Sequence, residues 1–202
     1  MRFKSIYITL LPALVMSLAV TESTAQDLTA NFTHIQAETF GSNMALSNAW
    51  GDYDNDGDLD LVVLFKTGDV RLYNNELGGF VNVGPALGLP TGGKERRAIA
   101  WGDYDGYLDL YIGSNRQGNE LFHNDKPQGF TEVTDELGVG MPQVSTRQIS
   151  WVDFDNNGTL DLFVADRVGS SVLFSNIDDE FVEVSAAVGL NDERATVGAC
   201  CS

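Results

Sequence analysis

Two stretches of the sequence place oxygen-bearing side chains at alternate positions around a glycine, a spacing that suits a hard cation. The first runs from Asp52 to Asp60, with aspartates at positions one, three, five, seven and nine and Gly57 at position six. Carboxylates at positions one, three, five and nine, together with the carbonyl at position seven, can supply the roughly six to eight oxygens that calcium prefers. Because the loop is rich in protein oxygens and flexible, calcium is favoured over magnesium.

The second stretch, Asp153 to Asp161, repeats this pattern with Asn157 at position five and Thr159 at position seven. Its ligand charge is lower, so weaker binding is expected, since ligand charge count tunes calcium affinity. Without a cation, several like charges this close together would repel one another. The sequence therefore predicts two calcium sites with these candidate ligands: Asp52, Asp54, Asp56, Asp58 and Asp60; and Asp153, Asp155, Asn157, Thr159 and Asp161.

A related loop between these two is shortened by two residues and lacks the ligand at position five. It keeps three carboxylates, so a weaker metal site is predicted at Asp103, Asp105 and Asp109. The EF-hand is excluded for the two full-length loops, because Val63 and Val164 stand where that motif needs a glutamate. A solvated acidic turn is the alternative for every loop, since Asp, Asn and Gly favour turns on their own.

The acidic loops recur because the chain repeats about every fifty residues. Trp50, Trp101 and Trp151 begin equivalent segments that lie 51 and 50 residues apart, and each unit holds four short β-type runs. Four strands per repeat of about 40 to 50 residues is typical of a β-propeller blade. The repeats are expected at about 42–90, 91–140 and 141–190. The sequence predicts an all-β fold, a partial β-propeller of three complete four-stranded blades.

Both ends of the chain are expected to carry one strand of a further blade. Residues 32–35 resemble a fourth strand, and residues 195–202 resemble a first strand. Propellers close at about four to eight blades, so three blades cannot close alone. We therefore expect an N-terminal fragment of a longer propeller. The alternative is that several copies assemble to complete the ring.

The segment Ala49–Leu61, which reads Ala-Trp-Gly-Asp-Tyr-Asp-Asn-Asp-Gly-Asp-Leu-Asp-Leu, resembles the FG-GAP/VCBS repeats, the calcium-loop blades also found in the integrin alpha-chain propeller. It looks most similar to the cartilage acidic protein (ASPIC/UnbV) branch. The resemblance covers nearly all of residues 31–202. It implies a seven-bladed propeller, calcium in the loops, and roles in adhesion or extracellular recognition. The chain departs from that branch in its shortened second loop and in lacking further blades and a C-terminal domain.

The first 25 residues have the layout of a secretory signal peptide. Arg2 and Lys4 precede an apolar stretch at residues 6–20, and Ser23 and Ala25 place small side chains before a cleavage site at Gln26. The apolar stretch is shorter than the roughly 20 residues that a membrane span needs. The mature chain, residues 26–202, is predicted to be secreted, extracellular or periplasmic, with no membrane span.

The charge balance excludes a nucleic-acid binder. The chain has 12 basic and 29 acidic residues and a formal charge of −17. This negative charge repels phosphate, whereas affinity for nucleic acid depends on basic side chains that displace counterions. The partners expected are calcium and an extracellular protein or glycan.

No catalytic residue is assigned. His123 stands where the other repeats have Asn74 and Ser175, which favours a turn residue over a catalytic base. The expected function is a non-enzymatic, calcium-stabilised module for extracellular interaction or adhesion. The alternative is a glycan-binding or glycan-active propeller, which as an enzyme needs two metal-free carboxylates about 5 to 9.5 Å apart in one cleft.

Overall fold

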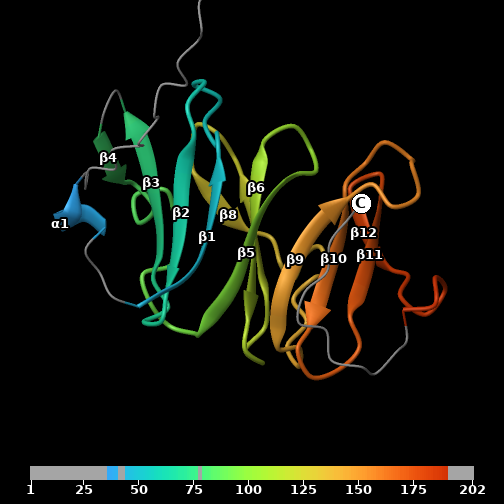
Figure 1. Ribbon diagram of the computed structural model, residues 1–202. Coiled ribbons are helices and arrows are strands. Elements are labelled where there is room, and N and C mark those ends of the chain that lie inside the picture. The colour runs from blue at the N-terminus through green and yellow to red at the C-terminus, as the bar shows by residue number, and fades with distance from the viewer. Residues whose placement is uncertain (1–35, 41–43, 77–78, 191–202) are drawn as a thin grey trace, which may run out of the picture. The chain divides into compact units, whose positions relative to one another are not determined.

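Three antiparallel sheets of four strands each make up the fold in the computed structural model, which describes residues 36–40, 44–76 and 79–190. In every sheet the strands follow one another in chain order, so each sheet is an up-and-down meander (Figure 1). One short helix, α1 (Ala37–Phe40), precedes them. The prediction of an all-β fold with three four-stranded blades is confirmed. The predicted signal peptide and the predicted strands at residues 32–35 and 195–202 lie outside the described residues.

The three sheets have closely similar strand lengths. The first sheet contains β1 (Ala45–Gly51), β2 (Asp60–Phe65), β3 (Val70–Glu76) and β4 (Gly79–Asn82). The second sheet contains β5 (Arg96–Asp103), β6 (Leu108–Ser114), β7 (Glu120–Asn124) and β8 (Phe130–Glu132). The third sheet contains β9 (Thr146–Val152), β10 (Asp161–Asp166), β11 (Val172–Ile177) and β12 (Glu180–Glu183).

The register of the strands follows the sequence repeat. In each sheet the tryptophan of the first strand lies opposite the leucine that follows the last aspartate of the acidic loop: Trp50 opposite Leu61, Trp101 opposite Leu110, and Trp151 opposite Leu162. A one-residue slip would turn every side chain to the other face of the sheet. The repeated motif therefore fixes which side chains face each neighbouring sheet.

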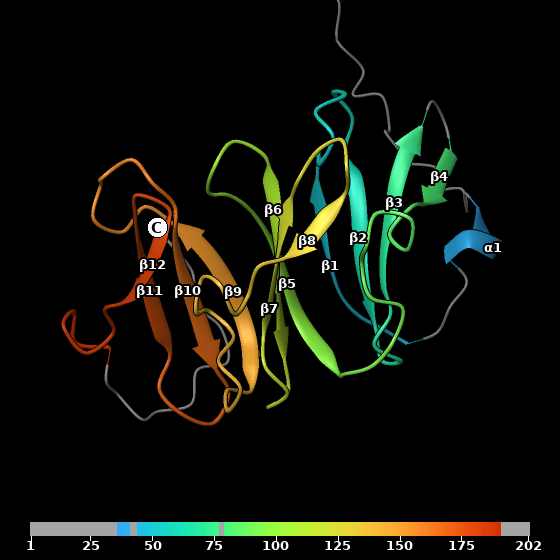
Figure 2. The same cartoon turned by 180° about the vertical axis from the view of Figure 1, so that it is seen from behind.

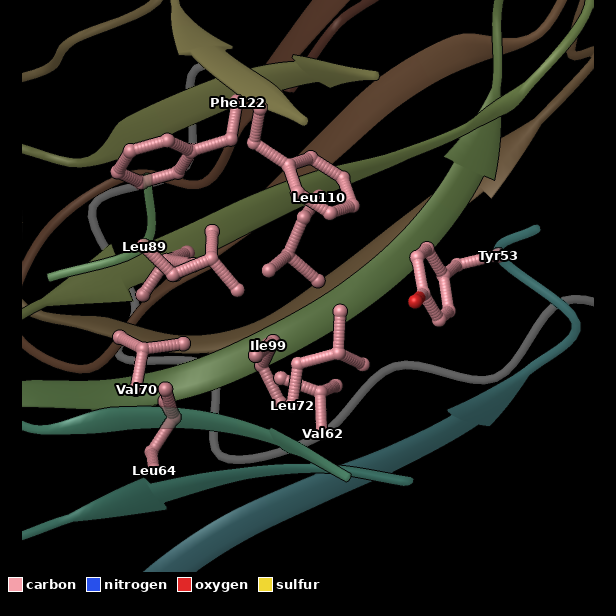
Figure 3. Packing of buried hydrophobic residues seen from close by; sticks show 11 residues of the cluster. Tyr53, Val62, Leu64, Val70, Leu72, Leu89, Ile99, Leu110 and Phe122 are labelled. Atoms are coloured by element: carbon pink, nitrogen blue, oxygen red, sulfur yellow. The ribbon is translucent and has the colours of Figure 1, made fainter. Parts of the chain in front are cut away.

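Apolar side chains fill the space between consecutive sheets. The first strands β1, β5 and β9 lie side by side (Figure 1; Figure 2). Between the first and second sheets, Val62 and Leu72 belong to a cluster with Leu110 and Phe122 (Figure 3). A second cluster joins the second and third sheets. Central strands such as β2 are buried on both faces, which explains why they read as continuous apolar runs rather than alternating ones.

The glycine that follows the tryptophan in one repeat lies against the tryptophan of the next repeat, so this contact joins neighbouring sheets. A Cβ atom placed on Gly102 would lie 2.3 Å from the ring of Trp151, and one on Gly51 would lie 2.8 Å from Trp101. Only glycine leaves room for the tryptophan of the next sheet at these positions. Trp101 and Trp151 are therefore partly buried and pack against these clusters, whereas Trp50 is 53% exposed because no sheet among the described residues covers it.

A buried ion pair within the second sheet also holds a contact to the first sheet. The Arg96 guanidinium, at the start of β5, lies 2.6 and 2.8 Å from the two carboxylate oxygens of Glu120 in β7. It also donates to the carbonyl oxygens of Gly68 and Gly92. The side chains of Arg96 and Glu120 are 4% and 6% exposed. Among the described residues, no helix is long and apolar enough to cross a membrane.

Candidate metal centres

The three acidic loops occupy equivalent places in the fold. Each joins the first strand of a sheet to the second, as β1–β2, β5–β6 and β9–β10, and all three lie at the same end of the sheets (Figure 1). This placement follows from the repeat, because a meander returns the same loop to the same edge in every blade.

The first loop wraps its backbone around Asp52. One carboxylate oxygen of Asp52 accepts a hydrogen bond from the amide of Asp56 at 3.0 Å, and the other accepts from the amide of Gly57 at 3.1 Å. The turn needs positive φ angles of 55° at Asn55 and 99° at Gly57. Asn and Gly tolerate this region better than other residues, which accounts for their positions in the motif.

Asp60, at the ninth position of the first loop, connects the loop to strand β3 through a hydrogen bond. Asp60 is fully buried. Its carboxylate accepts hydrogen bonds from the amide of Asn75 on β3 at 2.9 Å and from the amide of Tyr53 at 3.3 Å. Burial raises the pKa of Asp60 to about 6, the charge of Asp54 adds to the increase, and the two hydrogen bonds oppose it.

The oxygens of the first loop meet the requirements of a cation site. Asp52, Asp54 and Asp60 each offer a carboxylate oxygen, and these oxygens lie within 4.8 Å of one another. Asp56 and Asp58 are not part of this group. One oxygen of Asp54 and one of Asp58 are shielded from solvent and have no hydrogen-bond partner. Shielded acceptors without a donor are costly, and a cation held by Asp52, Asp54 and Asp60 would supply the missing partner of the Asp54 oxygen.

The pKa of Asp54 shows that the negative charges of this loop are crowded. Burial and then the neighbouring Asp56 raise the pKa of Asp54. The side chains are therefore held together against their mutual repulsion. A divalent ion would remove that cost by neutralising the carboxylates.

The third loop brings its residues together in the same way. Carboxylate oxygens of Asp153, Asp155 and Asp161 lie within 4.8 Å of one another. Asp161 accepts from the amides of Asn176 on β11 at 2.8 Å and Phe154 at 2.9 Å, as Asp60 does in the first loop.

The amide and hydroxyl of the third loop add internal donors. The Asn157 side-chain amide lies 3.4 Å from a carboxylate oxygen of Asp155, and the Thr159 hydroxyl donates to the Asn176 carbonyl at 2.8 Å. These neutral donors replace the carboxylates of Asp56 and Asp58. The third loop therefore relieves part of the crowding by itself.

The second loop assembles a different set of residues. Carboxylate oxygens of Asp105 and Asp109 and a ring nitrogen of His123 lie within 4.8 Å of one another. Asp103 is outside this group, and its carboxylate accepts the amide of Gly106 at 2.6 Å. Burial raises the pKa of Asp109 to about 7, and Asp105 adds to the increase.

His123 is the residue that the sequence interpretation missed. It lies within β7 rather than in a turn. Its repeat position carries Asn74 and Ser175 in the other sheets. In the second sheet, His123 lies beside Asp109, the buried last aspartate of the shortened loop. The sequence contains one indication of this role: the histidine occurs only in the repeat whose acidic loop is shortened.

Two segments of the chain, residues 52–106 and 103–164, match the family model of the FG-GAP-like repeat, and together they span more than half of the sequence. The chain belongs to the FG-GAP-like repeat family. The first match runs from the first acidic loop to the second, and the second match runs from the second acidic loop into strand β10. None of the curated proteins matches the chain.

Proposed function

We propose that this FG-GAP-like protein is a calcium-stabilised propeller module that binds a partner outside the cytoplasm and catalyses no reaction. The observation that carries the proposal is the shielded, unpartnered oxygen of Asp54, which belongs to the converging carboxylates of a loop whose pattern recurs in the third repeat. An acidic turn without an ion would leave that oxygen without compensation. Oxygen ligands alone favour calcium among the common cations.

The residues that would hold the ions are the converging carboxylates of two loops: Asp52, Asp54 and Asp60; and Asp153, Asp155 and Asp161. Bound calcium would supply positive charge that neutralises these groups. Asp60 and Asp161 also bind amides of β3 and β11, so each loop is tied to the third strand of its sheet. Folding would then gain the free energy of ion binding, because the unfolded chain holds no preformed site.

Export and partner class are supported by the sequence. The basic start, the apolar stretch at residues 6–20 and the small residues before Gln26 support removal of a signal peptide. The motif Ala49–Leu61 supports a place near the cartilage acidic protein branch of the family. We infer an extracellular protein or a glycan as the partner, and adhesion or recognition as the role.

Equilibrium dialysis of the protein against calcium tests the proposal. The expected result is two ions per chain, with one lost in Asp54→Asn and both lost in Asp54→Asn/Asp155→Asn. Asp135→Asn is the matched control, because Asp135 is exposed and lies outside the loops. Retention of both ions by the double variant would refute the assignment. Hydrolysis of a polysaccharide that Asp54→Asn abolishes without loss of structure would support the enzyme alternative instead.

A further inference from the structure

We propose that Asp105, Asp109 and His123 form a zinc site in the second sheet, distinct in its metal preference from the oxygen-only loops of the first and third sheets. The proposal rests on how the two carboxylates and the imidazole are arranged, and on the residue that faces the far side of the ring.

The Nδ1 atom of His123 faces two acceptors at once. It lies 3.1 Å from a carboxylate oxygen of Asp105 and 3.2 Å from a carboxylate oxygen of Asp109. The hydroxyl of Tyr104 is 3.3 Å from the same nitrogen. A lone pair on Nδ1 would repel both carboxylates, so either the hydrogen of an Nδ1–H group or a metal ion must lie between this nitrogen and the two oxygens.

The opposite nitrogen of the ring has the kind of partner that metal-binding histidines usually have. Nε2 of His123 lies 3.2 Å from a carboxylate oxygen of Asp125, which belongs to neither the loop nor the three-residue group. A metal-binding histidine usually donates its other ring N–H to a carboxylate, and this fixes the tautomer whose free nitrogen faces the ion. Asp125 stands in that supporting position and leaves Nδ1 to face Asp105 and Asp109.

The donor set and its spacing favour a small ion over calcium. The shortened loop lacks the ligand at position five, so fewer oxygens remain than the six to eight or so that calcium takes. One imidazole and two carboxylates suit zinc, which binds nitrogen and oxygen at about 2.0 to 2.2 Å, often with three protein ligands and one open position. Ligand atoms separated by 3.1 to 3.2 Å are compatible with such short bonds.

The site is anchored on one side and open on the other. Asp109 is fully buried and accepts the amide of Asn124 at 2.9 Å, so its carboxylate is fixed against β7. Asp105, His123 and Asp125 line an open cavity of about 520 Å³. An ion could therefore enter from solvent and keep a position for water.

Zinc titration in millimolar calcium tests the proposal, because calcium then competes for the two oxygen-only loops. All proteins carry Cys200→Ser and Cys201→Ser, since thiolates bind zinc strongly. We expect one zinc per chain, a loss of more than tenfold in affinity in His123→Asn and Asp105→Asn, and a loss of about 10- to 100-fold in Asp125→Asn. Asn is the residue of the first repeat at the position of His123, so His123→Asn is a conservative change for this strand.

Two controls separate this site from other histidine or carboxylate binding. His34→Asn removes the only other histidine and should leave zinc affinity unchanged, as should Asp135→Asn on the surface. Cobalt bound to the parent protein should shift the ring protons of one histidine in the NMR spectrum, a readout that needs no folded variant. Absence of stoichiometric zinc, unchanged affinity in His123→Asn, or cobalt binding without a shifted histidine would each overturn the proposal. The result does not depend on whether the other loops bind calcium.

Discussion

At the scale of single residues, the acidic loops hold carboxylates in places that are unfavourable without a cation. Asp54 has a shielded oxygen without a partner, and its pKa is raised by burial and by Asp56. The same side chain therefore destabilises the ion-free protein and stabilises the ion-bound one. Substitutions in this loop should have opposite effects in the two conditions.

The change Asp54→Asn tests this reversal of sign. In excess EDTA we expect the variant to be as stable as the parent or more stable, because one repelling charge is gone. In millimolar calcium we expect the free energy of unfolding to fall by about 1 to 3 kcal/mol, because a ligand is lost. Urea unfolding in both conditions measures it, with Asp135→Asn as control. Equal losses with and without calcium would show that Asp54 has only a structural role.

The raised pKa of Asp60 predicts a pH dependence in EDTA. A carboxyl group whose pKa is higher in the folded protein, here about 6, stabilises the fold at low pH, and that contribution is lost as pH rises through 6. We expect the free energy of unfolding to decline between about pH 4 and pH 7 by on the order of 3 kcal/mol from this group. Urea titrations at several pH values, compared with Asp60→Asn, measure the contribution. An identical pH profile for parent and variant would contradict it.

At the scale of elements, contacts between neighbouring sheets hold the blades together. Gly102 is in van der Waals contact with the Trp151 ring, and Arg96 binds the first sheet's Gly68 carbonyl while it pairs with Glu120. Neither contact involves an acidic loop. Changes at these positions should therefore lower stability whether or not calcium is present.

Gly102→Ala introduces a methyl group where the nearest ring atom would lie at 2.3 Å. The tryptophan must move, and we expect a loss of about 1 to 3 kcal/mol in the free energy of unfolding. Gly79→Ala is the matched control, because its new methyl would lie no closer than 3.7 Å to any described residue beyond its chain neighbours. Equal stability of the two variants would show that the Trp-Gly contact is not tight.

Glu120→Gln leaves the Arg96 guanidinium buried without its charge partner. Removal of one member of a buried ion pair typically costs about 3 to 5 kcal/mol, and the remaining carbonyl contacts of Arg96 should keep the loss near the lower value. Lys94 also lies 3.2 Å from Glu120, so the same change frees a second cation. Chemical unfolding of Glu120→Gln measures the loss, and a stability equal to that of the parent would contradict the inferred role.

At the scale of the whole molecule, the repeat made most of the fold predictable. The spacing of Trp50, Trp101 and Trp151 predicts three repeats, and the four β-type runs in each repeat predict three sheets of four strands. The same repeat predicts that an acidic loop joins the first two strands of each sheet. The site in the second repeat was only partly predictable. Alignment of repeats assumes that equivalent positions have equivalent roles, so His123 was compared with Asn74 and Ser175 rather than with the loop that it contacts.

Other features of the molecule depend on contacts that periodicity does not encode. The Arg96–Glu120 pair joins residues that each occur in one repeat only, and helix α1 lies before the first sheet, where the repeat gives no guidance. Exposure of Trp50 also follows from its place in the first sheet, not from its motif, which is the same as that of Trp101. Sequence repeats thus predict what the blades share and miss what distinguishes them.

Thermal unfolding in excess EDTA and then in millimolar calcium tests the central claim most directly. A single site at a hundredfold excess of calcium over its dissociation constant adds about 2.7 kcal/mol of stability. For a domain of this size each kcal/mol raises the midpoint by about 2 to 4 °C, so one occupied loop alone should give a rise of about 5 to 10 °C. The account predicts that rise and its disappearance in Asp54→Asn/Asp155→Asn. A folded protein with the same midpoint in EDTA and in calcium would contradict it and reduce the loops to acidic turns.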